Sequence, residues 1–283
     1  MINKKILVLG ATGMLGRCVY KYFSKNGFYS VFGTSRVKNK SFYFFDAKEI
    51  DSLENILGQT GQVEYIINCI GILKSGPSEN FSINYLLPKQ LEKLQKKYKF
   101  RLIHISTDDV FGAHSGKVNE KSTPSPNNPY ALSKLKGEVT SKFSINIRTS
   151  IIGFDPREKK GLIEWLIKNK NKNIQGYTNQ NWSGSTTLQF ARFCEYLIKN
   201  NHFEKTRSKT NRVHFSPLGP ITKYKLLKLI SEKLNIKVNI NKFEAEEKIN
   251  RNLSSIYFDK KFLQSYISDT GKAIIALKEF EEK

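Results

Sequence analysis

A short apolar run that leads into a glycine-rich loop constrains the fold of this chain more than any other segment. Ile6–Leu9 is continuously apolar, as a strand buried on both faces must be. Three glycines follow with the spacing G-x-x-G-x-x-G, and an amphipathic segment then runs to Lys25. Glycines between a strand and a helix let the backbone approach a pyrophosphate at the helix N-terminus. We therefore expect a dinucleotide to contact Gly10, Thr12, Gly13, Met14, Leu15 and Gly16.

Strand-like and helical segments alternate after this loop. Further strands are expected at Ser30–Thr34, Phe42–Phe45, Tyr65–Ile70, Leu102–Ser106 and Ile145–Arg148, and helices at Gly13–Lys25, Ile50–Leu57, Asn84–Lys97 and Tyr130–Lys142. This alternation predicts an α/β fold, a Rossmann-type doubly wound parallel sheet with right-handed crossovers.

The pattern loosens after Gly153, which predicts a second, smaller part of the chain. Helices are expected at Leu162–Lys168, Thr187–Ile198 and Lys223–Leu234, and a strand at Arg212–Phe215 that rejoins the sheet. We expect residues 1–152 to form an NAD(P)-binding domain to which residues 185–216 return. Residues 153–184 and 217–283 then form a C-terminal substrate-binding lobe.

The composition argues against several functional classes. The net charge of +22 is spread evenly over both halves of the chain, which favours a compositional bias over a nucleic-acid-binding surface. The positive electrostatic field of such a protein would still attract anionic substrates. Cys18, Cys69 and Cys194 form no CxxC and indicate reduced thiols in the cytoplasm. The four histidines lack ligand spacing, so no metal is expected, and the first apolar run is too short for a signal peptide or a membrane span.

The end of the second strand bears on the choice of cofactor. An acidic residue there would bind the adenosine ribose, but the strand ends in Arg36, which could pair with a 2′-phosphate. This favours NADPH, with NAD still allowed if Arg36 is an ordinary surface arginine. Cofactor contacts are also expected at the ends of the third and fourth strands, from Asp46, Ala47, Asn68, Cys69, Ile70 and Gly71. Asp46 could instead cap a helix.

A Tyr-x-x-x-Lys pattern places an ammonium beside a phenol on one helical face, which lowers the pKa of the phenol for acid–base catalysis. The pattern occurs at Tyr85/Lys89, Tyr130/Lys134, Tyr224/Lys228 and Tyr257/Lys261. The first contains Pro88, and the last two lie beyond the nucleotide-binding half. Tyr130 alone follows a strand-end hydroxyl pair, Ser106-Thr107, by two dozen residues.

With these segments, the chain resembles the extended short-chain dehydrogenase/reductases that act on nucleotide sugars, and within them the dTDP-4-dehydrorhamnose reductase family. The resemblance rests on GATGMLG, NCIG, Asn84, STDDVFG, YALSK with Gly137-Glu138, IRTSIIG and, in the second lobe, GYTNQNWSGSTT. It implies that Thr107 binds the substrate carbonyl, that Tyr130 donates the proton and that Lys134 tunes Tyr130 and binds ribose. Ser150 should pass near the nicotinamide, and the substrate should be a nucleotide-linked 4-keto-6-deoxy sugar.

Two departures from the family pattern stand out. Asp109 occupies a position where these reductases carry an aromatic or small residue, and Val118 replaces a common tyrosine before Glu120. Asp108-Asp109 could mimic the acidic pair of the sugar 4,6-dehydratases, or Asp109 could be a solvated loop carboxylate. Substrate contacts are expected from Asp108, Asp109, Val110, Asn179, Trp182 and Arg251, the last toward the diphosphate. Trp182 could also be core, and Arg251 a surface charge.

Three functions remain open at this stage. The first is NADPH-dependent reduction of a nucleotide-linked 4-keto-6-deoxy sugar in polysaccharide biosynthesis. The second is a 4,6-dehydratase or epimerase that retains NAD, and the third is a regulatory subunit of the same fold. We expect a cytoplasmic protein without nucleic-acid or membrane partners, in which a homodimer is the default assembly.

Overall fold

The computed structural model describes residues 3–73, 81–113, 116–266 and 268–283 of the 283-residue chain, which form two compact units. The first unit comprises Met1–Thr107, Asn128–Ile147 and Ala191–Val213. The second comprises Asp108–Asn127, Arg148–Phe190 and His214–Lys283. The chain therefore crosses between the units directly after Thr107.

The first unit is built around a sheet of seven strands, counted over the described residues, in the order β11-β7-β5-β4-β1-β2-β3. These are β1 (Lys4–Leu9), β2 (Tyr29–Ser35), β3 (Tyr43–Phe44), β4 (Tyr65–Asn68), β5 (Arg101–Thr107), β7 (Ser144–Thr149) and β11 (Arg212–His214). The pairings β1–β2, β1–β4, β2–β3 and β4–β5 are parallel. The doubly wound parallel sheet predicted from the sequence is confirmed, and the strand at Arg212 does rejoin it.

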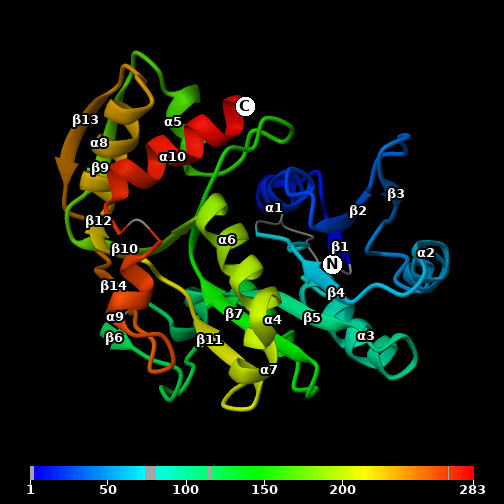
Figure 1. Ribbon diagram of the computed structural model, residues 1–283. Helices are drawn as coiled ribbons and strands as arrows, with labels where there is room; N and C mark the ends of the chain where they lie inside the picture. Colours follow the sequence, from blue (N-terminus) through cyan, green and yellow to red (C-terminus); the bar gives the residue numbers. More distant parts are fainter. Residues whose placement is uncertain (1–2, 74–80, 114–115, 267) are drawn as a thin grey trace. The chain divides into compact units, whose positions relative to one another are not determined.

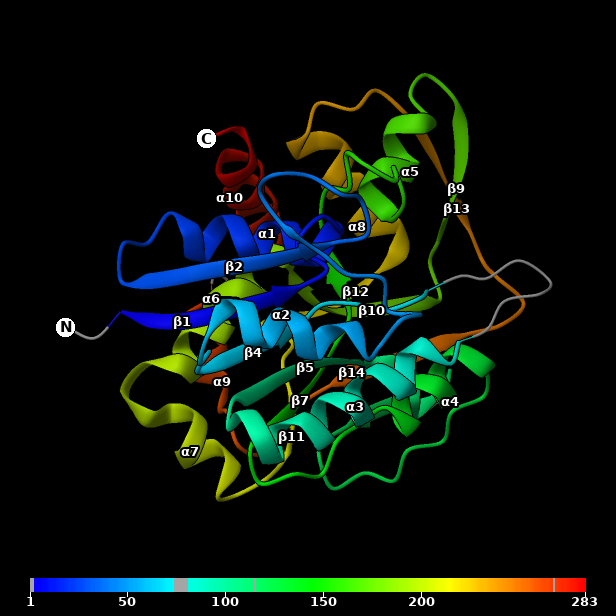
Figure 2. The same cartoon turned by 90° about the vertical axis from the view of Figure 1, so that its right-hand side faces the viewer.

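Helices cover both faces of this sheet. They are α1 (Met14–Ser24), α2 (Ser52–Thr60), α3 (Ile83–Tyr98), α4 (Pro129–Lys136), α6 (Thr187–Ile198) and α7 (His202–Arg207). Figure 2 shows α2 and α3 on the near side of β4 and β5, and α6 on the far side. The α2 and α3 side buries a cluster that includes Leu7, Leu57, Ile66, Leu91 and Leu102. Apolar residues on both faces of the strands explain their continuous apolar runs.

One predicted helix was wrong in length. The sequence suggested Tyr130–Lys142, but α4 ends at Lys136 and Gly137 follows as its C-cap. The next residues satisfy their backbone groups elsewhere: Glu92 accepts hydrogen bonds from the backbone N–H of Thr140 and Ser141 at 2.7 and 2.6 Å. With these side-chain partners available, the backbone has no need of further helical hydrogen bonds.

The second unit contains two smaller sheets (Figure 1). One joins β12 (Leu218–Thr222), β10 (Gln180–Thr186), β14 (Ile249–Leu253) and β6 (Gly116–Val118), with β8 (Ile151–Ile152) beside β10. The other pairs β13 (Asn239–Phe243) with β9 (Asn173–Tyr177). The helices are α5 (Leu162–Lys168), α8 (Lys223–Lys233), α9 (Lys260–Gln264) and α10 (Thr270–Glu282), with the 3-10 turn η1 (Asp108–Phe111). No helix within the described ranges is both long and apolar enough to cross a bilayer.

Candidate functional site

The glycine loop after β1 closes on itself tightly. Gly10 has φ +77°, a left-handed conformation that favours glycine, and its carbonyl accepts a hydrogen bond from the N–H of Gly13 at 3.0 Å. A Cβ on Gly16 would lie only 2.1 Å from the Gly10 oxygen, so a side chain there would displace the loop. Gly10 and Gly16 therefore shape the turn.

Gly13 has a different role in the same loop. It is exposed, it is the N-cap of α1, and no side chain caps the helix. The first turn of α1 also carries no acidic residue, so nothing there offsets the positive end of the helix dipole. A glycine at an uncapped helix N-terminus suits an anionic group, and this site therefore fits the pyrophosphate of a dinucleotide.

The end of β2 fixes the loop from the side, which the sequence analysis did not foresee. The Thr34 Oγ1 atom accepts a hydrogen bond from the Gly10 N–H at 3.0 Å, and the Thr34 carbonyl accepts one from Ala11 at 2.9 Å. A Cβ on Gly33 would lie 2.7 Å from the Cβ of Ala11. The signal available in the sequence was the Gly33-Thr34 pair at the end of this strand.

The predicted adenosine-side residues follow β2 and β3. Arg36 is exposed, as a residue that meets a phosphate from solvent must be. The carboxylate of Asp46 accepts a hydrogen bond from the Lys48 N–H at 3.0 Å, which fixes its orientation in a turn, and Ala47 is buried. Asp46 thus caps a turn before α2, whose own N-cap is Asp51.

The segment after β4 reaches the same edge of the sheet. The buried Asn68 accepts a hydrogen bond from the Ile70 N–H at 3.1 Å, and its amide contacts His104 Nδ1 on β5 at 3.2 Å. Burial, which the Lys134 charge reinforces, holds the pKa of His104 well below its usual range. Burial also raises the pKa of the Cys69 thiol. The thiol therefore stays protonated and neutral, and it is not an activated nucleophile.

The helix that carries Tyr130 and Lys134 begins at a defined cap. The side chain of Asn128 accepts a hydrogen bond from the Ala131 N–H at 2.8 Å, and Pro129 occupies the first helical position. Tyr130 is partly buried, and its ring lies 6.2 Å from that of Phe81. Because Lys134 is four residues further along the helix, both side chains lie on one face.

Lys134 is buried, with 3% of its surface exposed, and its Nζ atom donates to the carbonyl oxygen of Ile105 on β5 at 2.6 Å. Burial lowers its pKa to about 8, while Glu138 and Cys69 act in the opposite direction. Of the four candidate lysines in the Tyr-x-x-x-Lys patterns, Lys134 alone is buried: Lys228 and Lys261 are exposed and Lys89 is partly exposed.

A hydrogen-bond relay connects α3 with α4 next to Lys134. Asn84 donates to Ser133 Oγ at 2.9 Å and exchanges two hydrogen bonds with the backbone of Ile72, at 2.8 and 3.0 Å. Ser133 donates in turn to the Tyr130 carbonyl at 2.7 Å. A Cβ on Gly71 would lie 3.6 Å from Asn84 Oδ1 and 3.9 Å from Lys134 Nζ, which places the end of the NCIG segment beside this lysine.

The first unit thus gathers most of the predicted site residues at one edge. Gly10, Arg36 and Gly71 follow parallel strands, and the buried Thr107 ends β5. The carboxyl ends of parallel strands meet at one edge of a sheet, which is where ligands bind in this class of fold. Lys134 reaches this edge through its bond to Ile105.

The second unit holds the other predicted residues, and two of them form an ion pair. Nη1 of Arg251 on β14 donates to the Asp109 carboxylate on η1, and its Nε lies 4.0 Å from Asp108 Oδ2. Arg251 is mostly buried, with 17% of its side chain exposed. Val110, next along η1, is fully buried.

Other predicted residues of the second unit form hydrogen bonds within that unit. The Trp182 indole N–H donates to Ser150 Oγ at 2.8 Å, and a Cβ on Gly184 would lie 2.2 Å from the Ser150 oxygen. The Asn179 amide forms hydrogen bonds with the carbonyl and the N–H of Ala245 at 2.6 and 3.1 Å. Glu120 accepts from the His214 and Ile256 N–H groups, both at 2.9 Å. These bonds orient Trp182 and Ser150 toward each other and hold Asn179 against the 245 segment.

Comparison with known proteins supports the reading of the first unit. Residues 6–142 match the model of the NAD dependent epimerase/dehydratase family. The chain is 33% identical over 144 residues to methionine adenosyltransferase 2 subunit beta of Xenopus tropicalis, a match that covers 48% of this chain and 42% of that protein. It is 30% identical over 159 residues to dTDP-4-dehydrorhamnose reductase of Aggregatibacter actinomycetemcomitans, covering 52% and 51%. The matches thus span about half the length of these relatives or less.

A solved structure extends the likeness over the whole chain. A dTDP-4-dehydrorhamnose reductase from Bacillus anthracis, in complex with NADP, aligns with a TM-score of 0.77 and 20% identity, covering 99% of this chain and all of the other. At that identity the likeness establishes the fold. The comparisons together confirm the resemblance to extended short-chain dehydrogenase/reductases inferred from the sequence.

Proposed function

We propose that the protein is an NADPH-dependent reductase of the 4-keto group of a nucleotide-linked 6-deoxy sugar, working in polysaccharide biosynthesis. The observation that carries the proposal is the buried Lys134, held on the same helical face as Tyr130 and bonded to β5 two residues before Thr107. A buried ammonium at the ligand-binding edge of a doubly wound sheet supports the proposal, because burying a charge costs free energy and such perturbed groups cluster at functional sites.

In this mechanism each residue has a distinct task. Thr107 binds the substrate carbonyl oxygen, and Tyr130 donates its phenolic proton to that oxygen. The ammonium of Lys134 stabilises the phenolate that remains and binds the nicotinamide ribose. A bound dinucleotide would supply the hydride for the carbonyl carbon.

The cofactor would be held by residues of the first unit. Gly10, Gly13 and Gly16 would admit its pyrophosphate at the N-terminus of α1, and Arg36 would pair with a 2′-phosphate. The absence of an acidic residue after β2 favours NADPH, and NAD remains a weaker ligand in this proposal. The Asp46 carboxylate and the 68–71 segment would border the adenine and the nicotinamide.

The test is NADPH oxidation by the purified protein with a nucleotide 4-keto-6-deoxy sugar. Tyr130→Phe should lower kcat about 100-fold or more with little change in NADPH affinity. Tyr224→Phe is the matched control, because Tyr224 begins another Tyr-x-x-x-Lys pattern on α8 whose lysine is exposed. Absence of NADPH oxidation, together with NAD that co-purifies, would instead support a dehydratase or epimerase.

The likeness of the first half to a protein named as a subunit of methionine adenosyltransferase favours a second candidate, a non-catalytic subunit. The two functions separate in one experiment. If Tyr130→Phe leaves the biological role unchanged in cells that lack the wild-type protein, catalysis is not the function.

A further inference from the structure

One conspicuous side chain of the first unit has no part in the proposed chemistry. Glu138 follows α4 directly and is 5% exposed. Among the described residues of the first unit, Lys134 and Glu138 are the buried members of the Lys, Arg, Asp and Glu classes. The two residues have opposite charges and are four positions apart in the sequence. The buried acidic residue among them thus lies close in sequence to the buried basic one.

The carboxylate of Glu138 accepts hydrogen bonds from a serine and an arginine. Its Oε1 atom accepts a hydrogen bond from Ser106 Oγ at 2.8 Å, and its Oε2 atom accepts one from Arg212 Nε at 2.9 Å. Ser106 precedes Thr107, and Lys134 holds the carbonyl of Ile105. Lys134 and Glu138 thus form hydrogen bonds with consecutive residues, Ile105 and Ser106, near the end of β5.

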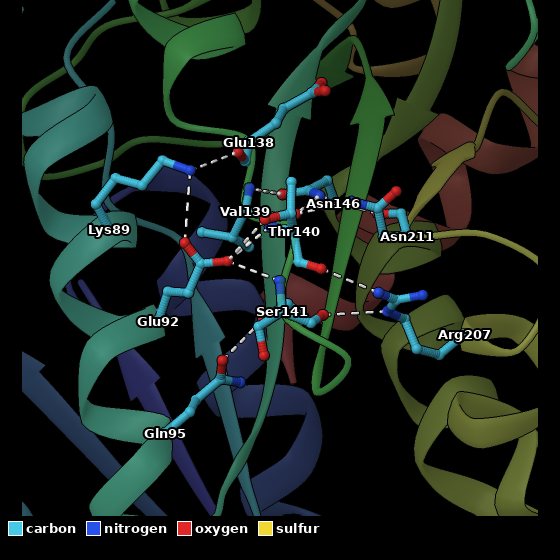
Figure 3. A network of polar contacts seen from close by, with 11 residues as sticks. Lys89, Glu92, Gln95, Glu138, Val139, Thr140, Ser141, Asn146, Arg207 and Asn211 are labelled. Atoms are coloured by element: carbon cyan, nitrogen blue, oxygen red, sulfur yellow. Dashed lines mark hydrogen bonds and ion pairs between the residues drawn. The ribbon is translucent and has the colours of Figure 1, made fainter.

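The backbone around Glu138 is itself held in place, as Figure 3 shows. Lys89 Nζ donates to the Glu138 carbonyl at 3.1 Å, and Glu92 accepts the N–H groups of Thr140 and Ser141. Arg207 donates to the Ser141 and Thr140 carbonyls at 3.1 and 3.0 Å. Residues of α3 and α7 therefore hold the backbone of residues 138–141 from two sides, and this fixes the position from which the Glu138 side chain extends.

We propose that Glu138 is a positioning residue of the reductase: its buried carboxylate is the counter-charge that keeps Lys134 an ammonium ion, and its bond to Ser106 holds the end of β5 against α4. The inference rests on the proposed function and deepens it. A buried carboxylate close by compensates part of the cost of burying the ammonium, a cost that is largest where water is excluded.

The groups that face Lys134 support this assignment. They are Cys69 after β4, His104 on β5, Tyr130 on the same helix and Glu138 after it. Burial keeps His104 neutral and Cys69 protonated by shifting their pKa values in the corresponding directions. Glu138 therefore supplies the negative charge that raises the pKa of Lys134 against the effect of burial.

The decisive measurement is the pH profile of kcat. Glu138→Gln keeps the shape of the side chain and an acceptor for Ser106 but removes the charge, so the alkaline limb should move to lower pH by roughly one unit. Glu138→Asp keeps the charge and should keep the limb near its wild-type position. Arg212→Gln is the matched control, since it removes the other partner of the same carboxylate; it should leave the limb in place.

A second measurement does not depend on activity. In a double-mutant cycle at pH 7, Glu138→Gln should lower the thermal unfolding midpoint less in a Lys134→Met background than in the wild type, because no buried ammonium is left uncompensated. If wild-type protein oxidises no NADPH, the proposed function fails while this cycle still tests the charge pair. Additive effects in the cycle, or an unmoved limb with a uniform loss of kcat in Glu138→Gln, would overturn the proposal.

Discussion

At the scale of single residues, the ion pair of Arg251 changes how Asp109 is to be understood. Asp109 is the residue that left a dehydratase open, because a carboxylate after the proposed catalytic threonine, Thr107, could act as an acid or base. The structure instead engages it with Arg251, whose guanidinium also faces Asp108. A carboxylate engaged by a guanidinium has a structural partner within the protein and is less available to a substrate. The pair therefore weighs against Asp109 as the acid or base of the alternative dehydratase.

Removing Arg251 should lower the stability of the folded protein. Arg251→Gln leaves two mostly buried carboxylates side by side with one cation fewer, and it should destabilise the protein by about 2 kcal/mol. Asp109→Asn should recover much of that loss in the double variant, because it removes one of the two negative charges. Urea denaturation of the two single variants and the double variant provides the comparison. A stable Arg251→Gln protein would show that the pair adds nothing to stability.

At the scale of elements, α4 depends on its cap more than its length suggests. It has eight residues and carries both Tyr130 and Lys134. Asn128→Ala removes the side-chain bond to Ala131 and should cost about 1 kcal/mol of stability. Because α4 holds the proposed catalytic pair, we expect kcat to fall as well.

Thr222 on the second unit provides the matched comparison for this cap. It caps α8 in the same way, by accepting a hydrogen bond from the Lys225 N–H. Thr222→Ala should cost a similar amount of stability and leave kcat near the wild-type value. Equal losses of kcat in Asn128→Ala and Thr222→Ala would mean that activity follows overall stability rather than the position of α4.

The elements also show where sequence reasoning succeeds and where it stops. Buried strands such as β1 and β4 are continuous apolar runs, so their type and order follow from local pattern. The strands β9, β13 and β14 were not predicted, since NIQGY, NINKF and INRNL have mostly polar residues and gain their order from pairing with distant strands.

The candidate site likewise contains some features that are local in sequence and others that depend on the fold. Its glycine loop and its Tyr-x-x-x-Lys pair are local in sequence and could be predicted. The contact of Arg251 with Asp109 joins residues 142 positions apart, and the hold of Thr34 on Gly10 depends on strand register. The same applies to Glu138, whose bonds to Ser106 and Arg212 come from other strands. Contacts of this kind are consequences of the fold, and no local pattern encodes them.

For the whole molecule, titration at alkaline pH combines opposing contributions. Lys134 has a pKa near 8 in the folded protein and an ordinary value of 10.5, so the unfolded chain binds more protons between these values and stability rises there. Burial raises the pKa of Tyr65 to about 12, and burial with Glu195 raises those of Tyr22 and Tyr29. The stability that these tyrosines contribute is lost as pH rises above their ordinary value of 10. The gain from Lys134 is therefore visible below pH 10.

Lys134→Met isolates that gain from the rest of the titration. At pH 7.5 the variant should be more stable than the wild type, because it buries a methionine of similar length in place of an ammonium. The difference should shrink steadily toward pH 9.5 as the folded wild type releases the Lys134 proton, while the titration of the other lysines affects both proteins alike. Urea midpoints of the two proteins at half-unit steps of pH give this difference directly. Parallel curves across the range would show that Lys134 keeps its proton in the folded state as firmly as in the unfolded chain, and would leave the depressed pKa without support.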